Sequence, residues 1–171
     1  MSKQRIAVAF LLAMLIVGVV TVYAGLSFIG GARVTVGSIH GTVDIAGFGN
    51  RTEFVTVDMH VYGNDLVASC VNRGGNRAPG QNPVDVDANV SSGAVYPARN
   101  GRATVNLSVE ILPTAAEAGC PNRNWRVTDL LGTIYVDFVA RDFSTNPVTT
   151  VTLQYVCLVN QPMQTVDCTQ R

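Results

Sequence analysis

Apolar and polar residues alternate with a period of two over most of the chain after residue 32, in short segments separated by turn-forming residues. Segment 103–111 is the clearest case, because all its odd-numbered positions are apolar and all its even-numbered positions are polar. Such alternation predicts a β-strand with one face on a hydrophobic core and the other in solvent. The pattern also predicts strands at 54–62, 83–90, 133–141 and 150–158, and shorter ones at 33–39, 42–46, 66–71 and 164–168.

The order of these segments indicates the fold class. No convincing amphipathic helix separates them. Asn100-Gly101 is a preferred two-residue hairpin turn, which we expect to join residues 94–96 to the strand that starts at Arg102. We therefore predict an all-β chain that forms an antiparallel β-sandwich of immunoglobulin-like type. A small barrel or a jelly roll is the second choice.

The start of the chain has a different pattern. Lys3 and Arg5 precede an uncharged apolar run of 19 residues, 6–24, which predicts an N-terminal hydrophobic export helix. The run is longer than a usual signal-peptide core and approaches the length that spans a bilayer. Two fates stay open: cleavage after Ala24, which we favour because a small residue stands at the cut, and retention as a signal anchor. The expected organisation is a signal peptide or anchor at 1–24, a short tether at 25–32 and a single sandwich domain at 33–171.

The charge of the chain limits its partners. After residue 24 it contains ten arginines, no lysine and twelve carboxylates, a net charge of −2. This balance gives no electrostatic support for nucleic acid or an anionic membrane surface as a partner. Membrane contact is expected only through residues 6–24, if they are retained.

Four cysteines follow the export segment. An even number in an exported chain predicts two disulfides in a secreted, extracellular or periplasmic protein. Zinc is disfavoured because no cysteine pair has C-x-x-C spacing and His40 and His60 lie well upstream. Four cysteines allow three connectivities, and we favour the one that joins the two long loops and clips the last strand to its predecessor. Its bonds are Cys70–Cys120 and Cys157–Cys168.

The two long loops, expected at 70–83 and 112–124, contain the candidate binding residues. They are rich in amides and guanidinium groups around the single tryptophan: Arg73, Asn76, Arg77, Gln81, Asn82, Asn122, Arg123, Asn124, Trp125 and Arg126. An indole ring stacks while these groups donate directional hydrogen bonds, so the set could bind a sugar, a carboxylate or a peptide backbone. The alternative is that the amides only shape turns and the tryptophan packs on the rim of the sandwich.

Three stretches carry a resemblance to known proteins. They are CVNRGGNRAPGQNP at 70–83, NGRATVNLSVEI at 100–111 and CPNRNW at 120–125. Together they resemble small exported bacterial β-domain proteins of unassigned function, over roughly residues 66–139. The resemblance implies a cysteine-stapled β-domain and supplies no catalytic residue.

Two further patterns resemble parts of a metal site or a catalytic site. Asp85, Asp87 and Asn89 alternate as at the start of a calcium loop, but the loop's glycine and final glutamate are absent, so a strand with a wet acidic face is preferred. Asp58 and His60 share one strand face and could form a carboxylate-oriented base, yet no nucleophile motif accompanies them. No metal or other cofactor is therefore predicted.

The sequence as a whole predicts an exported, non-enzymatic binding or structural module that acts at or outside the cell surface. Its ligand is unknown, with a glycan or a peptide as candidates. One alternative is the ectodomain of a single-span membrane protein, anchored by the N-terminal helix. A less favoured alternative is a small secreted hydrolase built around His60 and Asp58.

Overall fold

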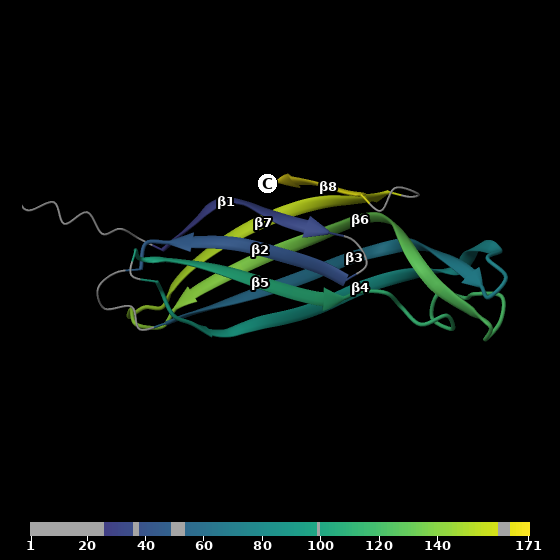
Figure 1. The fold of residues 1–171 in the computed structure, drawn as a ribbon, viewed down its shortest axis with the longest axis horizontal. Coiled ribbons are helices and arrows are strands. Elements are labelled where there is room, and N and C mark those ends of the chain that lie inside the picture. Colours follow the sequence, from purple (N-terminus) through teal and green to yellow (C-terminus); the bar gives the residue numbers. More distant parts are fainter. Residues whose placement is uncertain (1–25, 36–37, 49–53, 99, 161–164) are drawn as a thin grey trace, which may run out of the picture.

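The computed structural model describes residues 26–35, 38–48, 54–98, 100–160 and 165–171. In these ranges the chain forms two antiparallel sheets (Figure 1), with strand orders β1-β2-β5 and β4-β3-β6-β7-β8. The strands are β1 (Ser27–Thr35), β2 (Ser38–Ala46), β3 (Val55–Asn72), β4 (Arg77–Val95), β5 (Arg102–Glu110), β6 (Trp125–Asp142), β7 (Thr149–Asn160) and β8 (Thr165–Gln170). The expected all-β fold of two facing sheets is confirmed, and the immunoglobulin-like type stays a prediction.

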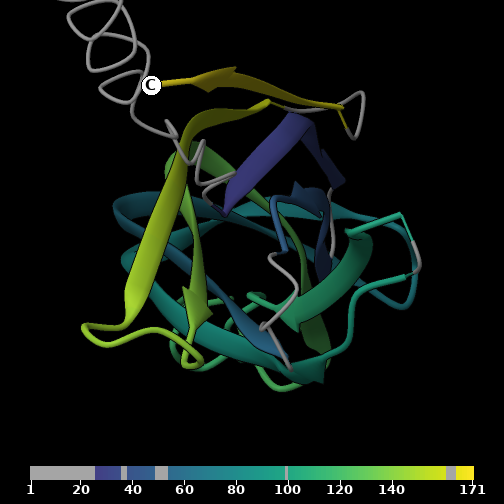
Figure 2. The ribbon, with the colours of Figure 1, turned by 90° about the vertical axis from the view of Figure 1, so that its left-hand side faces the viewer.

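The core lies between the two sheets, whose strands surround a common interior in the view along the molecule (Figure 2). Alternate residues of the central strands β3 and β6 point inward and are fully buried, as the period of two predicts: Val55, Val57, Met59, Val61, Ile134, Val136, Phe138 and Ala140. Gly41 on β2 faces this layer, and a Cβ there would lie 2.5 Å from the ring of Phe138. The glycine therefore makes room for the largest fully buried side chain.

Several strands are longer than the sequence pattern indicated. The strands expected at 54–62 and 66–71 form one strand, β3, because the intervening residues make a β-bulge rather than a turn. Asp65 adopts a φ of 54°, and its N–H donates to the Asp85 carboxylate at 3.0 Å. The freed backbone group is thus satisfied by a side chain of the neighbouring strand, and the chain bends without leaving the sheet.

The first strand also starts earlier than expected. β1 begins at Ser27, inside the segment 25–32 that was expected to be a tether. Ile39, expected at the end of the first strand, belongs to β2. Only Gly25 and Leu26 therefore separate the apolar run 6–24 from the sandwich.

The turn at Asn100-Gly101 forms but does not make a hairpin. Gly101 has a φ of 67° and donates its N–H to the Ala98 carbonyl at 2.9 Å. However, β4 pairs with β3 while β5 pairs with β2, so this connection crosses from the large sheet to the small one. The predicted turn is therefore confirmed. The strands on either side of it pair with other strands, because strand pairing depends on contacts between residues distant in the sequence.

In the described ranges, no helix has the length and apolar character needed to span a bilayer. The export helix expected at 1–24 lies outside those ranges.

Candidate functional site

Two disulfides staple the domain, in the predicted pairing. Cys70 at the end of β3 bonds to Cys120 in the β5–β6 loop, with the Cα atoms 5.8 Å apart. Cys157 on β7 bonds to Cys168 on β8, its cross-strand partner. Two disulfides are compatible with an extracellular or periplasmic location.

The segment 70–83 is not a long loop. β3 continues to Asn72 and β4 starts at Arg77, so only a turn at 73–76 lies between them. The Asn72 side-chain oxygen accepts the N–H groups of Gly74 at 2.9 Å and Asn76 at 3.0 Å, which closes the turn. Gly75 adopts a φ of 81°, a conformation that glycine tolerates best.

The other segment, 112–124, is a loop that is fixed against β4. Within it Thr114 and Glu117 bond reciprocally, because Glu117 Oε2 accepts the Thr114 N–H at 2.8 Å and Thr114 Oγ1 accepts the Glu117 N–H at 3.3 Å. Gln81 and Asn82 on β4 donate their N–H groups to the carbonyls of Gly119 and Ala118, each at 3.3 Å. Together with the Cys70–Cys120 bond, these contacts hold the loop at one end of the sandwich.

Glycine is required where the loop meets β4. A Cβ on Gly80 would lie 2.5 Å from the Ala118 carbonyl oxygen, and Ala118 itself is fully buried. Gly80 therefore lies in a strand rather than in a loop, and its missing side chain lets the backbone of β4 approach the backbone of the 112–124 loop.

The carboxylate of Glu117 gives the loop a pH dependence. Its pKa is lowered by the backbone hydrogen bond from Thr114 and then by the hydroxyl of the same residue. A lowered folded-state pKa contributes stability that is present above the unfolded value of about 4.3 and is lost as the pH falls through the folded pKa. We expect the stability advantage of wild type over Glu117→Gln to shrink between about pH 6 and about pH 3 in urea denaturation. An advantage that stays constant over this window would contradict the assignment.

The turn and the loop together form a cleft of about 550 Å³, where β3 ends and β6 begins. We call it the distal cleft, and it is lined by Val71, Asn72, Arg73, Gly75, Arg123, Asn124, Trp125 and Arg126. Its volume falls in the range of about 300–1,000 Å³ typical of small-molecule sites. Trp125 is half-buried, but in the described part of the chain it lies outside the hydrophobic core and the residues that pack on it.

The distal cleft is positively charged. Arg73, Arg123 and Arg126 are exposed, and no carboxylate lines the cleft. Among the described residues, none of these arginines forms an ion pair. The chain after residue 24 has a net charge of −2. The distal cleft is therefore a local positive patch on a domain whose net charge is negative.

The structure brings together half of the residues predicted for a binding surface. Arg73, Arg123, Asn124, Trp125 and Arg126 line the distal cleft. The other five do not line it and have structural contacts instead: Asn76 closes the turn, Arg77 lies 3.9 Å from Asp129, Gln81 and Asn82 hold the loop, and Asn122 bonds the N–H of Asn124. The side-chain amides of Asn82 and Asn122 have the turn-shaping role, because they bond to the backbone of Glu117 and Asn124.

Three lining residues were missed by sequence reasoning: Val71, Asn72 and Gly75. Asn72 carried a usable signal, because an asparagine two residues before a glycine pair often bonds its own backbone in a turn. Val71 carried none, since its place in the cleft follows from pairing with Arg126 across the sheet.

The Asp58–His60 dyad, considered as a less favoured alternative, does not form. His60 Nε2 lies 2.8 Å from Asp87 of β4, while Asp58 forms an ion pair with Arg141 of β6. Both partners are diagonal cross-strand neighbours, because Asn89 lies directly opposite His60 and Val139 directly opposite Asp58. Diagonal neighbours are within reach of long side chains. In the described residues no hydrogen bond joins His60 to a hydroxyl or thiol.

His60 instead belongs to a stacked row on the outer face of the large sheet. Its ring lies 4.8 Å from that of Tyr62, which lies 5.1 Å from that of Tyr135. Partial burial, followed by the nearby Asp137 carboxylate, raises the pKa of Tyr62 and keeps the phenol neutral. The row links three adjacent positions of β3 and β6, which is a structural role.

The acidic positions considered for calcium also have other contacts. Asp85 accepts the Asp65 N–H and Asp87 contacts His60. Both carboxylates are exposed on β4, as expected for the wet face of a strand.

Neither the comparison with protein-family models nor the comparison with curated proteins yields a match for this chain. The resemblance stated for residues 66–139 therefore stays a prediction.

Proposed function

We propose that this protein is an exported, non-enzymatic binding module whose distal cleft binds a carboxylate-bearing saccharide. The observation that carries the proposal is the set of three arginines without acidic partners around a half-buried tryptophan that is not part of the core. The sandwich, of immunoglobulin-like type in this proposal, serves as the rigid support for the cleft.

The chemistry of the cleft supports an anionic ligand. A guanidinium group donates two parallel hydrogen bonds to one carboxylate, which gives both energy and orientation. Arg123, Trp125 and Arg126 all line the distal cleft, so a ligand that fills it can contact the indole and the guanidinium groups together. Asn72 and Asn124 add amide groups suited to sugar hydroxyls.

The backbone of the cleft favours a saccharide over a peptide. One common way to bind an extended peptide is to add it as a strand to a free sheet edge. Here Val71 and Asn72 of β3 are paired with Arg126 and Trp125 of β6, so the cleft offers side chains rather than an open edge.

The ectodomain alternative is compatible with the same cleft, since it differs only in the fate of residues 1–24. The hydrolase alternative has less support, because no hydrogen bond joins His60 to a nucleophile among the described residues.

Calorimetric titration with a galacturonic acid trisaccharide tests the proposal. We expect binding that weakens with added salt, and at least about tenfold weaker binding of the neutral methyl ester, because the ester removes the charge that the arginines recognise. Equal affinity for acid and ester would contradict the proposal. Preferential binding of a glutamate-rich peptide would also contradict it.

A further inference from the structure

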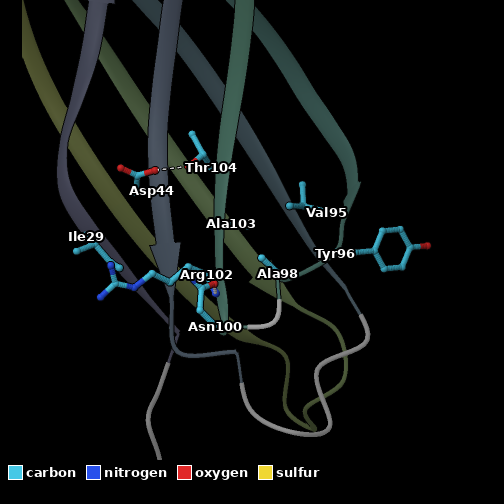
Figure 3. Close-up of a pocket in the computed structure, with 9 residues that line it drawn as sticks. All are labelled: Ile29, Asp44, Val95, Tyr96, Ala98, Asn100, Arg102, Ala103 and Thr104. Atoms are coloured by element: carbon cyan, nitrogen blue, oxygen red, sulfur yellow. Dashed lines mark hydrogen bonds between the residues drawn. The ribbon is translucent and has the colours of Figure 1, made fainter.

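The end of the molecule opposite the distal cleft exposes a group of apolar side chains. We call it the aromatic end, and it consists of the exposed Tyr96, Phe143 and Val148 around the half-buried Phe54. Tyr96 is 70% exposed, Phe143 51% and Val148 43%. The ring of Phe54 lies 6.2 Å from that of Tyr96 and 6.4 Å from that of Phe143. Figure 3 shows the Tyr96 ring pointing away from the neighbouring pocket, so the pocket does not shelter it.

These side chains come from three segments that meet at the same end of the sandwich. Phe54 precedes β3, Tyr96 follows β4, and Phe143 and Val148 lie between β6 and β7. The strand register joins them, because Val55 pairs with Val95 on one side and with Asp142 on the other. The carboxylate of Asp142 is buried and accepts hydrogen bonds from Ser144, so it does not add an exposed charge.

The first strand starts at this same end. Ser27 pairs with Ala46, which pairs in turn with Arg102, directly after the connection that contains Tyr96 (Figure 1). Only Gly25 and Leu26 lie between Ala24 and Ser27. At about 3.5 Å per residue, the end of the apolar run 6–24 is within about 10 Å of the start of β1.

We propose that the aromatic end rests on the surface of a lipid bilayer that residues 6–24 cross as a retained anchor. The run of 19 uncharged residues is close to the roughly 20 needed to span a bilayer. Tyrosine is favoured at the boundary of the bilayer with water, and phenylalanine side chains bury at the boundary between headgroups and acyl chains. A tether of two residues brings the exposed rings to that boundary, and the distal cleft then faces away from the membrane.

This inference chooses the anchor over cleavage after Ala24 and extends membrane contact beyond residues 6–24. It does not rest on the ligand proposed for the distal cleft. An exposed group of this kind on a freely soluble domain would be an unprotected apolar surface.

Quenching of tryptophan fluorescence by brominated lipid tests the contact. The full-length chain, with Trp125→Phe to remove its single tryptophan, receives Phe143→Trp and is reconstituted in phosphatidylcholine vesicles with or without bromine on the acyl chains near the headgroup. We expect brominated lipid to roughly halve the emission, because the indole lies at the interface. Val148→Trp in the same background gives a second probe of the same turn, should the first variant fail to fold.

Leu158→Trp is the matched control, because Leu158 is 48% exposed and lies nine residues along β7 from Thr149, roughly 30 Å from the aromatic end. Its emission is expected to be unchanged by bromine. Full emission from both turn probes would overturn the proposal, as would equal quenching at Leu158→Trp. Recovery of the wild-type protein as a species starting at Gly25 would overturn it independently, because the anchor would be gone.

Discussion

The double variant Cys70→Ala/Cys120→Ala is expected to lose about 4 kcal/mol of unfolding free energy and most of its affinity for the acidic saccharide. The bond closes a segment with a sequence separation of 50, and opening it releases that segment in the unfolded chain. In the folded chain the β5–β6 loop would still be held to β4 by hydrogen bonds from Gln81 and Asn82 and by the buried Ala118, but without a covalent bond. Arg123 lies in that loop and Trp125 follows it directly, so the cleft would lose its fixed geometry. Urea denaturation and calorimetric titration measure the two effects.

The second disulfide provides the control. Cys157→Ala/Cys168→Ala opens a separation of 11 and is expected to cost about 3 kcal/mol. Cys157 pairs with Ile134, nine residues along β6 from Trp125, so saccharide affinity should be retained. Wild-type affinity in the Cys70→Ala/Cys120→Ala variant would contradict the role given to the first bond.

Replacing two arginines of the distal cleft is expected to abolish measurable saccharide binding while leaving the fold intact. A hydrogen bond to a charged group contributes about 1.5–3 kcal/mol, so each of Arg123→Ala and Arg126→Ala should weaken binding by about 10- to 100-fold. Both side chains are exposed and form no ion pair in the described residues, so stability should change by less than about 0.5 kcal/mol.

Arg102→Ala is the matched control for these substitutions, because Arg102 is exposed and lies at the opposite end of the sandwich. It removes the same charge from the domain and should leave affinity unchanged. An equal loss of affinity in Arg102→Ala would mean that binding follows total charge rather than the cleft. Full affinity in the double variant would contradict the assignment of the cleft.

The fold was predictable where burial alternates along a strand. Segment 103–111 forms most of β5, and its apolar side faces the core. The preferred cysteine pairing, which joins the end of one strand to a long loop, was also correct. The extent of β4 was not predictable in this way. Pro79, Gly80 and Pro83 are typical of loops. However, β4 is the edge strand of its sheet, where a proline can lack a backbone N–H without breaking the strand pairing. Gly80 has no side chain, which lets the β5–β6 loop pack closely on the strand.

The sequence predicted which types of residue form the candidate site, but not which individual residues line it. Arg77 and Arg73 are equivalent in the sequence, and only cross-strand placement puts Asp129 beside the first of them. The same limit explains His60, whose carboxylate partner is Asp87 rather than Asp58. Side-chain partners across strands depend on register, which the sequence pattern does not specify on its polar face.

The signal of the Trp125 indole N–H in a two-dimensional nitrogen–proton NMR spectrum tests the central claim most directly. The chain has one tryptophan, so this signal is unique and reports on the distal cleft. Titration with the galacturonic acid trisaccharide is predicted to move it in a saturable way, together with side-chain N–H signals of Arg123 and Arg126, while the backbone N–H of His60 stays in place. Saturable movement of the His60 signal with an unmoved indole would show that the ligand binds elsewhere and would contradict the account.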